Sequence, residues 1–443
     1  MPRLRRFARH WLASASAALL LLGCGDSARL PLAAGVGPAP TLPAPHTSLI
    51  PTVLLTPAVG WPAGARPTPA ADLQVSAYAT NLSHPRWLTV LPNGDVLVAE
   101  TGAPSRPDDE RGFSGFLAKR AMQKVGAGDP SAERITLLRG VDAKGAAVTR
   151  STFLRNLHSP FGMALMGADF YVANTDAVVK FTYRAGELGI DTPGVKVIDL
   201  PAGTRNHHWT KNLLASADGT KLYVTVGSNS NVAENGMAAE HERACIWEID
   251  LRSGAHTVFA AGLRNPNGLA WQPETRVLWA VVNERDELGS NLVPDYLTAV
   301  QAGAFYGWPY SYFGAHVDAR VQPPRPELLA TTRTPDYALG PHTASLGLTF
   351  ASGSLLPETW RNGAFVGQHG SWNRQPLSGY QVLFIPFVDG RPSGDPRVAL
   401  NGFVNAAGEA MGRPVGVAMD AGGALLVADD IGNAVWRVTA RQP

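Results

Sequence analysis

The residues best suited to proton transfer in this chain of 443 residues lie together at 206–212, where the sequence is Asn-His-His-Trp-Thr-Lys-Asn. The stretch contains His207 and His208, and an imidazole titrates near neutral pH, so it can accept a proton without being permanently charged. A short apolar run, an Asp-Gly turn at 218–219 and alternating apolar residues over 222–226 follow it. This order predicts a β-hairpin that holds the polar residues at its open end.

The same pattern occurs six times along the chain. Each copy has a polar lead-in, an apolar run, a turn and a second apolar run with alternating residues, and the fifth copy has a longer insertion at its turn. The copies lie at residues 82–100, 157–174, 206–227, 263–283, 342–370 and 413–429. Intervals of roughly fifty to eighty residues fit the blades of a β-propeller with long loops. We therefore predict an all-β fold for residues 72–443, a six-bladed β-propeller of four-stranded antiparallel blades. Unrelated hairpins of a β-sandwich are the alternative.

A propeller would bring the polar ends of these hairpins together. Both open ends of a hairpin lie on the same side, because the chain reverses direction at the turn. The lead-in residues are Arg86, His207, His208, Arg264, Asn265, His342 and Arg413. The lead-out residues are Glu100, Ser228, Asn229, Asn283, Glu284, Arg285, Asp286, His369, Asp429 and Asp430. We expect them to surround a polar pocket on one face, near the central axis.

The N-terminal region has the features of a targeting segment. Arg3, Arg5, Arg6 and Arg9 precede an apolar stretch at 11–22 that is too short to span a bilayer as a mature helix. Residues 21–24 read Leu-Leu-Gly-Cys, which resembles the bacterial lipobox. We therefore expect a lipoprotein signal peptide at 1–23 and a lipid on Cys24. A secretory signal with a chance cysteine is the alternative.

This interpretation places the protein on the periplasmic side of the bacterial envelope, at the outer membrane, with the lipid as its only membrane contact. Residues 24–71 are rich in Pro and Ala with almost no periodicity, so we expect a tether there. Only the apolar patch at 49–55 could instead lie on the body as a strand. The chain has 38 basic and 36 acidic residues, and residues 1–23 hold four of the arginines and no acid. The mature protein is then slightly acidic, which argues against nucleic acid as a partner.

Five motifs in order support a family resemblance. They are His-His-Trp-Thr-Lys-Asn-Leu at 207–213, Gly-Leu-Arg-Asn-Pro-Asn-Gly-Leu-Ala at 262–270, Val-Asn-Glu-Arg-Asp-Glu-Leu-Gly at 282–289, Phe-Tyr-Gly-Trp-Pro-Tyr at 305–310 and Gly-Gln-His-Gly-Ser-Trp-Asn-Arg at 367–374. Together they resemble the glucose/sorbosone dehydrogenase family, and most closely its sorbosone and pyranose dehydrogenase branch. The resemblance extends from about Leu73 to Val438.

The resemblance implies an oxidoreductase that uses pyrroloquinoline quinone (PQQ) and Ca²⁺ to oxidise the C1 hydroxyl of aldoses or related alcohols. A histidine would take the hydroxyl proton while hydride passes to the C5 carbonyl of the quinone. An arginine and the calcium ion would polarise that carbonyl. The electron acceptor, a cytochrome or a quinone, would be separate, because the sequence has no Cys-x-x-Cys-His haem motif.

The resemblance also implies roles for individual residues. The catalytic residues would be His208 as general base and Arg264, with His207 in a structural role. The cofactor-binding residues would be Arg86, Lys211, Arg264, Asn265, Asn267, His369, Trp372 and Arg413. Calcium would be held by main-chain oxygens at Arg285 and Asp286, where relatives have a Gly-Pro pair. Because the ligands would be main-chain oxygens, the substitution need not abolish binding.

Two other function classes stay open from the sequence. A lactonase-like hydrolase on a propeller would hold Ca²⁺ through side chains of several blades, and the lead-outs offer Glu100, Asn174, Asn229, Asn283 and Asp429. A non-catalytic propeller that binds envelope partners would not need inward-facing cations. The presence of Lys211, Arg264 and Arg413 therefore counts against this third class.

Overall fold

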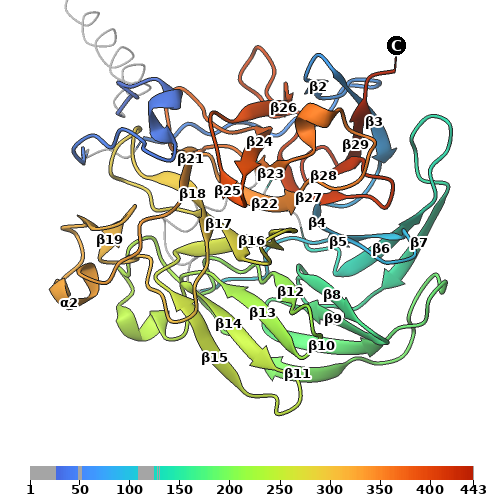
Figure 1. Ribbon diagram of the computed structural model, residues 1–443, viewed down its shortest axis with the longest axis horizontal. Coiled ribbons are helices and arrows are strands. Elements are labelled where there is room, and N and C mark those ends of the chain that lie inside the picture. Colours follow the sequence, from blue (N-terminus) through green and yellow to red (C-terminus); the bar gives the residue numbers. More distant parts are fainter. Residues whose placement is uncertain (1–25, 48–51, 108–123, 127, 129, 443) are drawn as a thin grey trace, which may run out of the picture.

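The computed structural model describes residues 26–47, 52–107, 124–126, 128 and 130–442. Nearly all of its regular structure is β-strand, arranged as six antiparallel sheets about a central axis (Figure 1). The prediction of a six-bladed β-propeller is therefore confirmed.

Each blade contains four main strands in antiparallel order. Blades one and two consist of β4 (Pro85–Val90), β5 (Val96–Glu100), β6 (Arg134–Arg139), β7 (Thr149–Leu154), β8 (Met163–Met166), β9 (Asp169–Ala173), β10 (Ala177–Thr182) and β11 (Val195–Asp199). Blades three and four consist of β12 (Leu213–Ala215), β13 (Lys221–Val226), β14 (Cys245–Asp250), β15 (His256–Ala261), β16 (Asn265–Trp271), β17 (Leu278–Asn283), β18 (Pro294–Ala299) and β21 (Tyr337–Pro341). Blades five and six consist of β22 (Ser345–Phe350), β23 (Gly363–Gln368), β24 (Gln381–Val388), β26 (Arg397–Asn401), β27 (Pro414–Met419), β28 (Leu425–Asp429), β29 (Ala434–Ala440) and β3 (Leu73–Ala79).

The six repeats found in the sequence are the first two strands of the six blades. The first strands β4, β8, β12, β16, β22 and β27 contact one another in this order around the ring, and β27 contacts β4. The ring closes through β3, which pairs with β29 as the outer strand of blade six. The polar lead-ins therefore all enter the innermost strands, next to the axis.

The hydrophobic core lies between neighbouring blades. Trp279 and Leu297 of blade four, for example, pack with Leu348 and Phe387 of blade five. The first strands approach so closely that a Cβ on Gly347 would lie 2.2 Å from the main-chain oxygen of Val415 in the next blade. Glycine is required there because any side chain would collide with backbone that cannot move aside.

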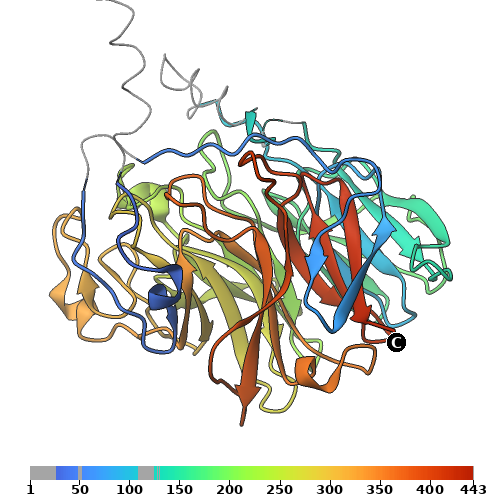
Figure 2. The same ribbon diagram turned by 90° about the horizontal axis from the view of Figure 1, so that it is seen from above.

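The segment expected to be a tether is packed against the propeller. β1 (Val36–Gly37) adds a strand to blade four by pairing with β21, and β2 (Thr68–Pro69) adds one to blade five by pairing with β26. Trp61 donates a hydrogen bond to Asp429 Oδ2 at 2.7 Å. Figure 2 shows this segment, in blue, along the surface of the propeller before β3. Residues 26–47 and 52–71 therefore do not extend away from the body, because exposed strand edges and aromatic packing hold them there.

The other parts of the predicted N-terminal organisation fall largely outside the structure. The signal peptide at 1–23 and Cys24 lie outside the described residues, so the domain boundaries stay predictions. Of the apolar patch at 49–55, the described residues 52–55 are not in a strand.

The remaining elements are short and lie in loops. They are η1 (Leu32–Gly35), η2 (Met237–Glu240), β19 (Ser311–Tyr312), β20 (His316–Val317), α2 (Pro326–Leu329), η3 (Glu358–Trp360) and β25 (Arg391–Pro392). The hairpin β19–β20 and α2 form an insertion between β18 and β21 of blade four. Within the described part of the chain, no helix is long and apolar enough to cross a membrane.

Candidate active site

The lead-in of blade three holds His208 in one tautomer. Its Nδ1 lies 2.8 Å from the main-chain oxygen of Ser228 and 3.0 Å from Ser228 Oγ. A carbonyl oxygen can only accept a hydrogen bond, and Ser228 Oγ donates its own proton to Ser230 O at 2.7 Å. Nδ1 of His208 must therefore carry the proton, which leaves Nε2 with a free lone pair.

The surroundings of His208 also keep it neutral. Burial lowers its pKa well below the ordinary value, and the positive charge of Arg264 and the neighbouring His207 lower it further. The rings of His207 and His208 meet edge to face, with centroids 4.7 Å apart. His207 is exposed, whereas His208 is partly buried. His208 is thus a neutral acceptor near neutral pH, as a general base requires.

His208 lies beside the lead-in of blade four. A Cβ on Gly227 would lie 2.4 Å from Asn265 Oδ1 and 2.5 Å from Cβ of His208, so these two side chains meet over this glycine. Arg264 is almost fully buried and donates hydrogen bonds to Asn231 O at 3.2 Å and to Glu284 O at 2.7 Å. The guanidinium of Arg264 is thus fixed next to the histidine by main-chain oxygens.

A buried ion pair continues from Arg264 into blade five. Asp286 Oδ2 lies 3.8 Å from Arg264 Nη2, and Asp286 Oδ1 lies 3.3 Å from His342 Nδ1. The other ring nitrogen of His342 lies 3.0 Å from Gly289 O. Both ring nitrogens face acceptors, so both carry protons and His342 is a cation. Burial alone would lower the pKa of His342, but the hydrogen bond and charge of Asp286 outweigh this and raise it.

A second charged group comes from blades one, five and six. Asp430 accepts hydrogen bonds from Arg86 Nη1 at 2.7 Å and from His369 Nε2 at 2.9 Å. Burial lowers the pKa of His369 to about 4 despite the charge of Asp430. Arg413 lies over the ring of Tyr380 at 5.2 Å, and its positive charge also acts on His369. Arg86, His369 and Arg413 therefore gather as the sequence predicted.

The group around Asp430 lies next to the lead-in that carries His208. The guanidinium of Arg86 lies 5.7 Å from the ring of Trp209, which is the neighbour of His208 in the lead-in of blade three. Polar residues from blades one, three, four, five and six thus converge at one place. This agrees with the expectation that the open ends of the hairpins surround one pocket.

Several buried polar atoms at this place have no hydrogen-bond partner among the described residues. They are Arg413 Nε and Nη2, Arg86 Nε, Asn265 Oδ1, Asn267 Oδ1 and Asp430 Oδ1. A buried polar group without a partner costs free energy, so natural proteins rarely keep several together unless a ligand or water uses them. The unpaired guanidinium donors suit an anionic ligand, and PQQ carries three carboxylates. The residues present therefore fit this cofactor.

Lys211 and Asn267, both predicted at the cofactor, are buried and bonded to other residues of the protein. The side chain of Lys211 is fully buried, and its Nζ lies 3.3 Å from Trp209 O and 3.5 Å from His208 O. Lys211 therefore stabilises the loop that carries His208. Asn267 donates a hydrogen bond to Thr210 Oγ1 at 3.1 Å and links blades three and four. Neither contact tests their predicted role at the cofactor.

The two residues expected at the calcium site have other partners in the structure. The side chain of Arg285 is fully buried and donates to Pro309 O at 2.7 Å, Ser311 O at 2.6 Å and Glu284 Oε2 at 3.0 Å. The carboxylate of Asp286 is neutralised by Arg264 and His342, and its pKa is about 2 because these partners outweigh its burial. Neither side chain is thus directed at an open metal site.

Three main-chain oxygens of the same loop are also engaged, among them that of Asp286. Those of residues 284, 286 and 289 accept hydrogen bonds from Arg264 at 2.7 Å, Arg320 at 2.9 Å and His342 at 3.0 Å. Among the described residues, no group of three or more His, Cys, Asp or Glu side chains could hold a metal ion. Calcium prefers six to eight oxygen ligands. These oxygens face three cations instead, so they do not form an open coordination shell.

The side chains that the hydrolase alternative requires have structural roles. Four of them accept a hydrogen bond from the backbone N–H of the lead-in of their own blade: Glu100 from residue 83, Asn174 from residue 158, Asn229 from residue 207 and Asp429 from residue 413. Asn283 lies 3.4 Å from Nη1 of Arg264. These contacts hold the loops in place, and they give no support to a metal shared by several blades.

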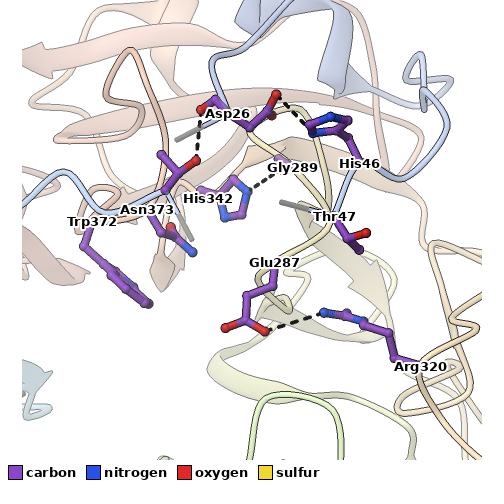
Figure 3. Close-up of a pocket in the computed structure, with 10 residues that line it drawn as sticks. Asp26, His46, Thr47, Glu287, Gly289, Arg320, His342, Trp372 and Asn373 are labelled. Atoms are coloured by element: carbon purple, nitrogen blue, oxygen red, sulfur yellow. Dashed lines mark hydrogen bonds and ion pairs between the residues drawn. The ribbon is translucent and has the colours of Figure 1, made fainter. Parts of the chain in front are cut away.

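A cavity of about 300 Å³ opens beside His342 (Figure 3). It is lined by Asp26, His46, Thr47, Thr52, Glu287, Gly289, Arg320, His342, Trp372 and Asn373. Trp372 was predicted at the cofactor, and its side chain is 45% exposed. The cavity shares His342 with the buried ion pair, so it adjoins the converging lead-ins.

Sequence reasoning missed several of these residues as site residues. Asp26 and His46 come from the segment expected to be a tether, and Arg320 lies in the insertion of blade four. Asp430 was predicted only as a lead-out residue. Its acidic side chain directly after β28, opposite the cationic lead-ins, could have indicated that it pairs with Arg86 and His369.

Comparisons with known proteins agree with this architecture. A family model described as TrAA12-like matches residues 134–300 and 329–441, more than half of the chain. An uncharacterised protein of Borreliella burgdorferi is 25% identical over 304 residues, 65% of this chain and 77% of that protein. Aldose sugar dehydrogenase YliI of Escherichia coli is 29% identical over 188 residues, 41% of this chain and 44% of that protein.

Among solved structures, the holo form of the pyranose dehydrogenase PQQ domain from Coprinopsis cinerea has a TM-score of 0.66 to this chain. The two chains are 20% identical, and the match covers 85% of this chain and 97% of that one. At this identity the likeness shows the same fold. The expected resemblance to PQQ-dependent sugar dehydrogenases is confirmed, and on the family match the chain belongs to the TrAA12-like family.

Proposed function

We propose that this protein is a PQQ-dependent oxidoreductase that oxidises the C1 hydroxyl of aldoses or related alcohols. The observation that carries the proposal is His208, a neutral histidine with a fixed tautomer and a free Nε2, at the point where lead-ins from several blades converge. The names of the Escherichia coli relative and of the Coprinopsis cinerea structure support the substrate and the cofactor.

The residues of the chain then have separate tasks. His208 accepts the hydroxyl proton at Nε2, and Ser228 keeps Nδ1 protonated so that the ring cannot switch tautomer. Arg413 and Arg86 have unpaired donors for the carboxylates of the quinone. The guanidinium of Arg264, fixed beside His208, would stabilise negative charge that develops on a cofactor bound there. The quinone, when bound, supplies the acceptor for the hydride.

Reconstitution of the purified protein tests the proposal. PQQ is added to the protein, and reduction of an artificial dye is followed with a panel of aldoses and with their 1-deoxy analogues as controls. The proposal expects dye reduction that requires both PQQ and a free C1 hydroxyl. Equal activity without PQQ, or no activity with any sugar after PQQ is shown to bind, would contradict it.

Calcium is implied by the resemblance, but the main-chain oxygens of residues 284, 286 and 289 already accept hydrogen bonds from cationic side chains. We expect the quinone-free protein to bind Ca²⁺ only weakly, with a Kd above about 10⁻⁴ M. The reason is that an incoming metal ion would have to displace three cationic side chains. Isothermal titration calorimetry measures this, with a parallel titration of the PQQ-loaded protein. Tight stoichiometric binding without PQQ would show that the loop rearranges to form a complete site.

The envelope location is a further part of the proposal. Cys24 lies outside the described residues, and the order of basic, apolar and small residues before it supports lipidation. Replacing Cys24 by Ser should abolish incorporation of labelled palmitate and move the protein from the membrane fraction to the soluble fraction. The parent protein, expressed in parallel, is the control. If the parent is itself soluble and unlabelled, the proposed anchor is wrong.

A further inference from the structure

The N-terminal segment joins two loops at the edge of the cavity. Asp26 Oδ2 accepts a hydrogen bond from the backbone N–H of Ser290 at 2.7 Å, and Ser290 Oγ donates to Asp26 O at 2.7 Å. The backbone N–H of His46 donates to Leu288 O at 3.1 Å. Leu54 donates to the main-chain oxygen of Trp372 at 2.7 Å. The segment is thus fixed both to the loop after β17 and to the loop after β23.

Side chains of this segment form one wall of the cavity. Asp26, His46, Thr47 and Thr52 are four of its ten lining residues. Figure 3 shows Trp372 and Thr47 on opposite sides of His342, with Glu287 and Arg320 below them. The propeller alone would leave this side open, so the segment completes the cavity.

The charged groups in the wall already have partners. Asp26 accepts a hydrogen bond from the backbone N–H of Ser290 at 2.7 Å and lies 3.3 Å from His46. Arg320 pairs with Asp318 at 2.7 Å and lies 3.9 Å from Glu287, and His342 lies 3.3 Å from Asp286. A ligand with a net charge would therefore meet no unpaired counter-charge, and desolvating such a ligand is costly. Hydroxyl groups, in contrast, can exchange hydrogen bonds with these side chains and with Thr47 and Asn373. The wall therefore suits a neutral, polyhydroxylated ligand.

The exposed ring of Trp372 adds an apolar face to this polar cavity. His342 connects the cavity to Asp286 and, through it, to Arg264 in the proposed active site. We propose that the cavity is the subsite for a neutral sugar and that residues 26–47 are its specificity-determining wall. This inference rests on the proposed function and adds that the N-terminal segment selects the substrate.

His46→Ala is the test variant, because the side chain of His46 is 52% exposed and its backbone contact to Leu288 does not depend on the ring. Loss of one hydrogen-bonding group should raise KM for neutral sugars about threefold to tenfold. kcat and the Kd of PQQ should stay close to the parent values. Val59→Ala is the matched control, since Val59 belongs to the same segment, is 51% exposed and does not line the cavity.

Sugar binding to the quinone-free protein is measured by equilibrium dialysis as a second readout, which does not depend on turnover. Weaker binding by His46→Ala, with Val59→Ala unchanged, supports the inference even if PQQ gives no activity and the proposed function fails. Unchanged KM and unchanged dialysis for His46→Ala would overturn the inference while leaving a PQQ-dependent activity intact. Tighter binding of a uronic acid than of its neutral aldose would also overturn it.

Discussion

Replacing His208 by Gln should lower kcat by about 10²- to 10⁴-fold, the usual loss when a general base is removed. The fixed tautomer is the reason, because Nδ1 donates to Ser228 O and only Nε2 can accept a proton. Glutamine retains hydrogen-bonding capacity but cannot take a proton near neutral pH. PQQ binding and the melting temperature should stay near the parent values, and kcat is measured by dye reduction at saturating sugar.

The pH profile gives a separate check on the same histidine. The pKa of His208 is lowered by burial and by Arg264, so the neutral form should persist well below pH 6.5. kcat/KM should therefore stay high near neutrality and fall only as acid protonates Nε2. His207→Ala is the control, since His207 is exposed and should have a milder effect. If His207→Ala is the inactive variant instead, the base is assigned to the wrong residue.

The fold could be predicted from sequence because its signals are local. The turn between β12 and β13 needs a residue with positive φ, and Gly219 supplies it at 69°. Asp218 Oδ1 accepts a hydrogen bond from the backbone N–H of Thr220 at 3.1 Å, and this bond stabilises the same turn. Turn chemistry of this kind specifies the hairpins without reference to distant parts of the chain, and only β22 and β23 of blade five are joined by a longer connection among these six hairpins.

The path of the N-terminal segment could not be predicted in this way. Asp26 and Ser290 are 264 residues apart, and β1 and β2 pair with strand edges that exist only after blades four and five have formed. The segment lacks periodicity because isolated contacts, rather than one continuous apolar face, hold it in place. A Pro- and Ala-rich composition therefore predicted a tether where the structure has a wall of the cavity.

The positions of charged side chains could be predicted only in part, because their burial also depends on distant segments. Residue type and position at the open ends of the hairpins correctly brought the lead-in residues Arg86 and Arg413 together with the lead-out residue His369. The same reasoning could not show that Lys211 would be buried on main-chain oxygens or that Arg285 would be enclosed by the insertion of blade four. Burial of a charge depends on which loops cover it, and the sequence near that charge does not contain this information.

Replacing Arg413 by Met should raise the Kd of PQQ about tenfold to a hundredfold. Arg413 Nε and Nη2 are buried and have no hydrogen-bond partner among the described residues, so their donors are available to a carboxylate of the cofactor. A hydrogen bond to a charged group contributes about 1.5–3 kcal/mol, and about 1.4 kcal/mol corresponds to a factor of ten. Methionine fills a similar volume but offers no donor. The Kd is measured by titrating PQQ into the metal-free protein and following its absorbance.

The fold of the Arg413→Met variant should be preserved, which separates lost binding from lost structure. The contact that holds the loop runs from the backbone N–H of Arg413 to Asp429 Oδ1 at 2.7 Å, and the substitution leaves it in place. The melting temperature of the quinone-free variant should therefore be close to that of the parent. Arg441→Met, at an exposed arginine directly after the end of β29 that lies away from Asp429, is the matched control and should bind PQQ normally. A Kd for Arg413→Met within twofold of the parent would mean that another cation holds the carboxylates, and Arg86, whose Nε is also unpaired within the described structure, is then the next residue to replace.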